Sequence, residues 1–169
     1  MNASHATASD NCLLEAMSPE LSRRIVEGSE IATLHVGDVL SEYGKKPSHV
    51  YFPLSCSISL VICIDDHPPF ELAMIGSDGV LGCSEVLGVS EAPMRAIARS
   101  KGETVKMPMQ TFKSFLQDFP VLKADVKQYL FELLEQVNRN AGCSHFHQVS
   151  GRLARWLLTT ADRSHEESC

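Results

Sequence analysis

Two histidines separated by one residue, His145 and His147, form the pair in this sequence that most suggests metal chemistry. The pattern around them predicts a helix, and residues i and i+2 of a helix point about 200° apart. The two imidazoles therefore cannot bind one ion unless the helix has already ended. A cupin-type metalloenzyme needs such a pair on a strand inside a sheet, so the position of this pair argues against that enzyme class.

The remaining polar residues do not have the spacing of a catalytic centre. The sequence offers no nucleophile with a placed base and no paired-carboxylate site. Its six cysteines include no CxxC pair, and we expect them to be reduced and mostly buried. The sequence therefore predicts no enzyme, no catalytic residue and no metal site.

Length and charge narrow the function classes further. With 169 residues, 44% of them hydrophobic, the chain can bury one good core and little more. The formal net charge of -6 argues against a free-standing nucleic-acid binder. The N-terminus lacks the pattern of a secretory signal, and no apolar run approaches the roughly 18 residues that span a bilayer. We expect a cytoplasmic protein without a membrane partner.

The spacing of hydrophobic residues changes along the chain, and it predicts the helices and strands that would position any site. After a polar tail, a short helix is predicted over 18–27, with Ser18 as N-cap and Pro19 in the first turn. Short β-prone runs with turn residues between them then fill 31–108, which is typical of an antiparallel sandwich or barrel. A helix over 109–119 and a much longer one over 121–147 complete the pattern.

The long helix carries an apolar stripe with the spacing of a coiled-coil seam. Val126, Leu130, Leu133 and Val137 follow a four-three-four step. Such a stripe can face the barrel or another subunit. A helix of more than twenty residues is longer than a small barrel can cover, so we predict a homodimer in which part of the seam packs on a symmetry mate. Asn140 continues the seam and could fix its register, line a cavity or lie at a solvated end.

Several strings in this order resemble the Crp/Fnr family of bacterial transcription regulators, over about residues 12–163. They are "GDVLSEYGKKPSHVYFPLSCSISLV", "ELAMIGSDGVLGCSEVLG", the long helix and "VSGRLARWLL". The resemblance implies an α+β, mainly β fold: an antiparallel double-stranded β-helix or jelly-roll β-roll with short flanking helices and one long C-terminal dimerisation helix. It divides the chain into a disordered tail (1–11), a cyclic-nucleotide-binding-like β-roll (12–120), the dimerisation helix (121–148), and the hinge and first helix of a truncated winged helix-turn-helix domain (149–169).

The resemblance also implies an effector site in the roll. In members that bind cyclic nucleotides, a Gly-Glu-Leu turn holds the ribose, an Arg-Ser/Thr-Ala string holds the cyclic phosphate, and a polar pair on the long helix contacts the purine. The matching positions here are Gly82, Cys83 and Ser84 in the turn, Met94, Arg95 and Ala96 in the string, and Val137 and Asn138 on the helix.

These positions depart from the pattern of a cyclic-nucleotide site. Cys83 replaces the carboxylate and Met94 replaces the cation that a buried monoanion requires. Moving Arg95 into the cation position needs a one-residue slip, which turns the strand over unless a bulge absorbs it. We therefore do not expect binding of cyclic AMP or cyclic GMP. Two alternatives stay open: the pocket takes another small effector, or it has closed and packs as core.

By the same resemblance, Val149, Ser150 and Gly151 form the hinge to a DNA-binding domain. The recognition helix and wing would follow Cys169, so we expect DNA binding only where that part is present. The first function hypothesis is an effector-sensing and dimerisation module of a Crp/Fnr-type regulator, with an unknown small molecule and no other cofactor. The second is a non-DNA-binding interaction protein that forms mixed dimers with a full-length regulator, and a cupin-like enzyme is a distant third.

Overall fold

The N-terminal helices begin where the sequence supplies caps. The computed structural model describes residues 10–64, 67, 69–146, 150–151, 153–154 and 157–158. In α1 (Cys12–Glu15) the Asn11 side chain accepts a hydrogen bond from the Leu14 amide, and in α2 (Pro19–Glu27) Ser18 accepts one from Leu21. The predicted start of the second helix at Ser18 and Pro19 is therefore confirmed.

Asn11 corrects the boundary of the predicted tail. Its side chain is fully buried, and its amide donates hydrogen bonds to the carbonyls of Pro53 (2.8 Å) and Gly79 (3.1 Å). A buried amide needs such partners, because an unpaired polar group in the interior is costly. Asn11 therefore belongs to the folded domain and joins the first helix to the end of β3 and to the loop that follows β5.

Within the described part of the chain, seven short strands form two antiparallel sheets, and the predicted mainly β jelly-roll fold class is confirmed. They are β1 (Glu30–Leu34), β2 (Val39–Ser41), β3 (His49–Pro53), β4 (Ile58–Ile62), β5 (Phe70–Ile75), β6 (Arg95–Ala98) and β7 (Gly102–Pro108). The sheet orders are β1-β7-β3 and β2-β6-β4-β5, so β5 is an edge strand. A single bridge between Tyr51 and Leu81 precedes the short 3-10 helix η2 (Cys83–Leu87).

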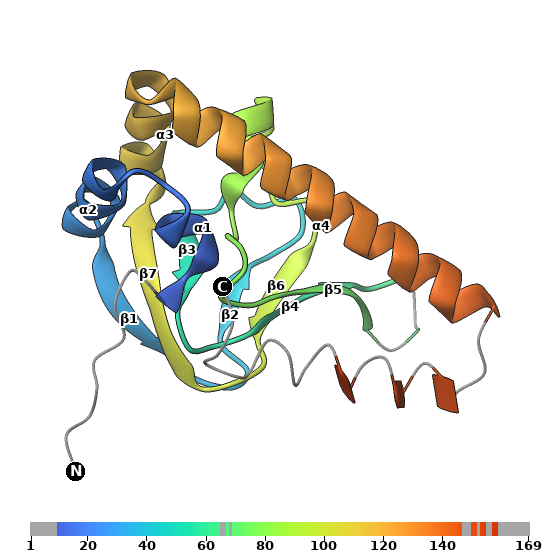
Figure 1. Cartoon of the computed structure of the whole chain (residues 1–169). Coiled ribbons are helices and arrows are strands. Elements are labelled where there is room, and N and C mark those ends of the chain that lie inside the picture. Colours follow the sequence, from blue (N-terminus) through green and yellow to red (C-terminus); the bar gives the residue numbers. More distant parts are fainter. Residues whose placement is uncertain are drawn as a thin grey trace, which may run out of the picture.

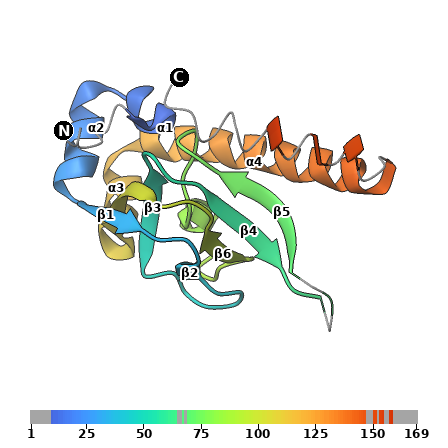
Figure 2. The same cartoon turned by 90° about the horizontal axis from the view of Figure 1, so that it is seen from below.

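The helices α3 (Met109–Asp118) and α4 (Pro120–Phe146) follow β7. α3 ends at Phe119, whose backbone leaves the helical region because Pro120 follows it. α4 has 27 residues and is about 40 Å long. Figures 1 and 2 show α4 running along the whole roll, beside the β5 strand. Among the described residues, no helix is long and apolar enough to cross a bilayer.

Two hydrophobic cores lie on opposite sides of the β1-β7-β3 sheet. The helix core joins this sheet to the helices, and its buried members are Leu14, Met17, Leu21, Ile25, Val50, Phe52, Leu54, Val80, Cys83, Val86, Val105, Met107, Phe112, Leu122, Val126 and Tyr129. The roll core fills the space between the two sheets with Leu34, Tyr51, Cys56, Ile58, Leu60, Ala73, Ile75, Leu81, Ala96 and Ala98. Alternation along β3 produces this division, because Val50 and Phe52 enter the helix core and Tyr51 enters the roll core.

The cysteines correct one expectation. Cys56, Cys63, Cys83 and Cys143 are not in disulfides, whereas Cys12 is disulfide-bonded. The prediction of reduced cysteines is therefore wrong at Cys12. Spacing along a sequence does not reveal such a bond, because the fold brings distant thiols together.

Only some of the C-terminal residues for which predictions were made lie within the described part of the chain. α4 continues through His145, whereas His147 lies outside the described residues. Of the predicted hinge, Ser150 and Gly151 are helical and exposed, and Val149 lies outside the described residues.

Candidate functional site

The backbone that leads into η2 is shaped by a glycine. Gly82 has a φ of 88°, and a Cβ added there would lie 2.8 Å from the His49 carbonyl oxygen. Only glycine avoids both the left-handed strain and this contact. Gly82 therefore has a backbone requirement that is independent of any ligand.

Cys83, which replaces the expected carboxylate, lies in the helix core rather than in the roll. Its side chain is 4% exposed, and its thiol donates a weak hydrogen bond to the Val80 carbonyl at 3.7 Å. Burial raises the pKa of the Cys83 thiol to about 12, so the group is neutral at physiological pH. The neighbouring Ser84 is half-buried.

Glu85, the next carboxylate in the turn, is already paired. It forms an ion pair of 2.8 Å with Lys113 of α3, and only 14% of its side chain is exposed. The carboxylate is therefore held toward the helices. Its recruitment to a ligand in the roll would require a different turn.

The register of β6 separates Met94 and Ala96 from Arg95. Ala96 is fully buried in the roll core, and Met94 packs against the same core. Arg95 pairs with Val61 across the sheet, and its Nε lies 3.2 Å from Glu42 Oε1. Since the geometry is that of an ion pair without a proper hydrogen bond, Nε has no hydrogen-bond partner. The guanidinium is paired with Glu42 instead of lying in the roll core with Ala96.

The long helix brings one of its two expected ligand residues to the roll. Val137 packs against the roll core, together with Leu133 from the previous turn. Asn138 is exposed. Of the eight residues expected around an effector, Met94, Ala96 and Val137 lie at the roll core, whereas Cys83 lies in the helix core, Arg95 pairs with Glu42 and Asn138 is exposed.

The five residues expected at the dimer seam lie on the face of α4 that packs on its own domain. Val126 is 0% exposed, and Leu130 and Leu133 pack against the helix core. Asn140 donates a hydrogen bond of 2.8 Å to the Leu72 carbonyl of β5. The sequence left open whether this stripe faces the barrel or another subunit. In the structure it faces the barrel, and Val137 also packs against the roll core.

A second stripe on α4 remains exposed. Phe131 is 57% exposed and Leu134 is 54% exposed, and Asn138 and Ala141 continue the line with three-four-three spacing. The sequence analysis missed this stripe because it is interrupted by polar residues. Phe131 and Leu134 themselves, placed between charged neighbours, were the available signal.

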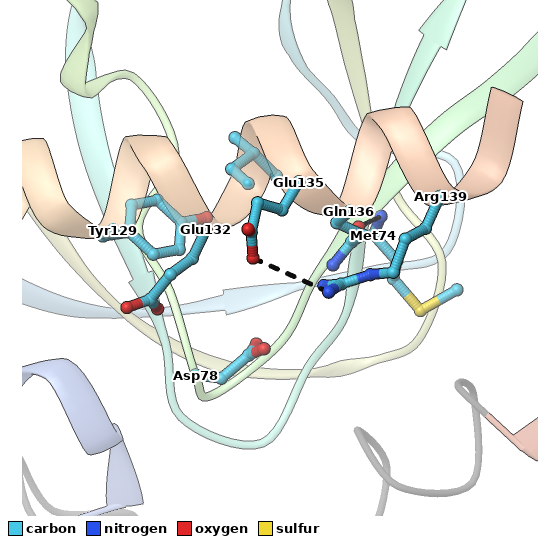
Figure 3. A pocket seen from close by; sticks show the side chains of 8 residues that line it. Met74, Asp78, Tyr129, Glu132, Glu135, Gln136 and Arg139 are labelled. Atoms are coloured by element: carbon cyan, nitrogen blue, oxygen red, sulfur yellow. Dashed lines mark hydrogen bonds and ion pairs between the residues drawn. The ribbon is translucent and has the colours of Figure 1, made fainter. Parts of the chain in front are cut away.

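A hollow of about 250 Å³ lies under the middle of α4. Its lining residues are Met74, Asp78, Tyr129, Glu132, Leu133, Glu135, Gln136 and Arg139. Figure 3 shows the helix above the hollow and Asp78 facing it from the turn that follows β5. Arg139 forms an ion pair of 3.6 Å with Glu135. In the described part of the chain, no group of three metal-ligating side chains is suitably placed.

Close packing beside the hollow explains another glycine. A Cβ on Gly79 would lie 2.5 Å from two atoms of the Tyr129 side chain. Tyr129 itself is buried in the helix core. The turn can therefore approach α4 only because residue 79 lacks a side chain.

The comparisons with known proteins bear on the fold. No protein-family model matches the chain, and no curated protein sequence matches it. Among solved structures, the c-di-GMP responsive global regulator CLP of Xanthomonas campestris aligns over 83% of this chain and 70% of its own, with a TM-score of 0.69 and 18% identity. A CooA mutant from Carboxydothermus hydrogenoformans aligns over 92% and 99%, with a TM-score of 0.62 and 16% identity.

A third neighbour narrows the description of the fold. A cyclic nucleotide-binding domain from Methylobacillus flagellatus aligns over 79% of this chain and 77% of its own, with a TM-score of 0.60 and 14% identity. The descriptions of these neighbours name a global regulator and a cyclic nucleotide-binding domain. The chain therefore has the fold of a cyclic nucleotide-binding domain.

Proposed function

We propose that this chain is an effector-responsive regulatory module of the Crp/Fnr type that forms dimers through α4. The observation that carries the proposal is the contact of Leu133 and Val137 with the roll core. A change in the packing of the roll interior is thereby transmitted to the helix that leads out of the domain. A ligand that favours one packing shifts the population of helix positions.

The chemistry of the roll supports an effector other than a cyclic nucleotide. A cyclic phosphate is a monoanion, and binding it in the interior requires a fixed cation. Met94 stands in the cation position, Arg95 is paired with Glu42, and the neutral thiol of Cys83 lies in the other core. The half-buried rim of the roll core is apolar, with Leu40, Met94, Leu133 and Val137. We therefore propose an uncharged, predominantly apolar effector.

Calorimetric titration tests the class of effector. We expect cyclic AMP to give no binding heat, and we expect the neutral apolar probe N-phenyl-1-naphthylamine to bind. Met94→Asp should weaken the probe at least tenfold, because it places a charge at the apolar rim. Arg95→Gln changes the adjacent, outward residue and should leave the affinity within twofold. Binding of cyclic AMP, or equal effects of the two variants, would contradict the proposed site.

Dimerisation is assigned to the exposed stripe Phe131, Leu134, Asn138 and Ala141. The three-four-three spacing suits packing of two α4 helices against each other, and the predicted seam on the neighbouring face of α4 is already covered by the chain's own cores. Mixed dimers with a full-length regulator would use the same stripe. DNA contact would need residues beyond those described, in keeping with the net charge of -6.

Sedimentation equilibrium tests the stripe. We expect a dimer at micromolar concentration and at least a hundredfold weaker association for Leu134→Asp, because a carboxylate would be buried in an apolar seam. Gln128→Asp adds the same charge at an exposed position off the stripe and serves as the control. A monomeric wild-type protein, or equal association of the two variants, would show that the stripe does not form a homodimer.

A further inference from the structure

The edge strand β5 has main-chain groups that no other strand can satisfy. It pairs with β4 on one side only, and the register shift between Leu60 and Val61 leaves Leu72 without a partner residue on β4. The groups on the other side of an edge strand normally need solvent, another chain or a covering element. In this protein α4 is the covering element.

Two side-chain amides one helical turn apart bind this edge. The Gln136 Oε1 atom accepts a hydrogen bond of 2.9 Å from the Met74 amide, and the Asn140 Nδ2 atom donates one of 2.8 Å to the Leu72 carbonyl. Both contacts go to the main chain of β5. They fix the position of α4 against the sheet whatever side chains β5 carries.

The two halves of α4 are held by different forces. In the first half, Leu122 and Val126 are fully buried in the helix core. In the second half, Leu133 and Val137 are only partly buried against the roll core, and Cys143 is 7% exposed. The two amide hydrogen bonds therefore add to limited apolar burial in holding the second half in place.

We infer that Gln136 and Asn140 form a releasable latch, which holds the second half of α4 on the edge of β5 and sets the direction in which the helix leaves the domain. The inference deepens the proposed function, because it names the contact through which the roll controls the helix. Met74 and Gln136 also line the hollow under α4, so the part-buried bond between them lies beside a space that water can enter. Water can replace such a bond at a small net cost, so the latch can open without unfolding of the cores.

Native-state amide exchange of the intact chain in low denaturant tests whether the latch opens alone. We expect the Met74 amide and the α4 amides of residues 138–146 to exchange through local opening, with almost no dependence on denaturant. The amides of Leu60 and Ala96 should exchange only through global unfolding, with the full dependence. If Met74 and residues 138–146 follow the global dependence, the latch is not releasable and the inference is wrong.

Two near-isosteric variants test the residues. Gln136→Met and Asn140→Leu keep the approximate side-chain size and remove the hydrogen bond. We expect Gln136→Met to speed exchange of the Met74 amide at least tenfold and Asn140→Leu to speed exchange at residues 138–146 by a similar factor, while Leu60 and Ala96 stay unchanged. The matched control is Gln128→Met, at an exposed position on another face of the helix, which should change these rates by less than twofold.

These measurements remain separate from the proposed function. Exchange at Met74 reports the latch in a monomer or a dimer, with or without an effector. Unchanged exchange in Gln136→Met and Asn140→Leu would overturn the latch even if the protein is a dimer that binds the apolar probe. A monomer that binds no probe would contradict the proposed function and leave the exchange result standing.

Discussion

The two cores of this small domain use different building blocks. The helix core contains the largest fully buried side chains, among them Phe52, Phe112, Leu14 and Ile25. The roll core includes three alanines and a cysteine, and its rim is only half-buried. Large interlocking side chains give stability, whereas small ones beside an open rim leave room for adjustment. The difference suggests that the helix core keeps the domain folded and that the roll core can respond.

Thiol reactivity gives the largest expected effect. Burial raises the pKa of Cys83 to about 12 and that of Cys56 to about 11. At pH 8 a thiol with a pKa of 12 is thiolate in about one part in ten thousand, and the thiolate is the reactive form. We expect iodoacetamide to modify exposed Cys63 at least a thousandfold faster than Cys83, as followed by mass spectrometry. Cys56 in the roll core should react before Cys83, and the reverse order would contradict the proposed difference between the cores.

Truncation of a large side chain should lower the free energy of unfolding more in the helix core than in the roll core. Phe112→Ala removes a fully buried ring from the helix core and should lower the free energy of unfolding by about 3–5 kcal/mol. Leu60→Ala in the roll core should cost less, about 2–3 kcal/mol, because its open rim can relax into the space. Urea denaturation measures both. A greater loss of unfolding free energy for Leu60→Ala would contradict the proposed difference between the cores.

Replacement of glycine by alanine should have opposite effects on stability at Gly79, which contacts α4, and at Gly142, which lies within it. Gly79→Ala places a methyl group against Tyr129 and should lower the free energy of unfolding by about 1–3 kcal/mol. Gly142 lies in α4 with open space around its Cα, so Gly142→Ala should raise it by up to about 1 kcal/mol. Thermal denaturation followed by circular dichroism compares the two. A loss of stability in both variants would mean that close packing at Tyr129 is not the cause.

The ion pair at the border of the helix core has the smallest expected effect. Glu85→Gln removes its pairing with Lys113 and should lower the free energy of unfolding by about 0.5–1 kcal/mol, less in high salt. Glu20→Gln breaks an exposed pair with Arg24 and should change almost nothing. Urea denaturation at two salt concentrations distinguishes the pairs. Equal effects would show that partial burial adds no strength at Glu85.

Local signals predicted the fold well, and tertiary contacts explain what they missed. Ser18 and Pro19 mark the start of α2, and alternation in 31–108 indicates short antiparallel strands, because caps and pleats depend on neighbouring residues. The spacing of Val126, Leu130, Leu133 and Val137 correctly places them on one face of α4. Spacing does not reveal what covers that face. The burial of Asn11, the bond at Cys12 and the amide contacts of Asn140 likewise depend on residues far away in the sequence.

The contact between Gly79 and Tyr129 also limits how this domain can evolve. Fifty positions separate the two residues, yet neither can change freely while the other stays the same. In homologues of this chain we expect a side chain at position 79 only where position 129 holds a smaller residue than tyrosine. Such linked substitutions would trace the close approach of the turn and the helix through a lineage, even where little other sequence identity survives.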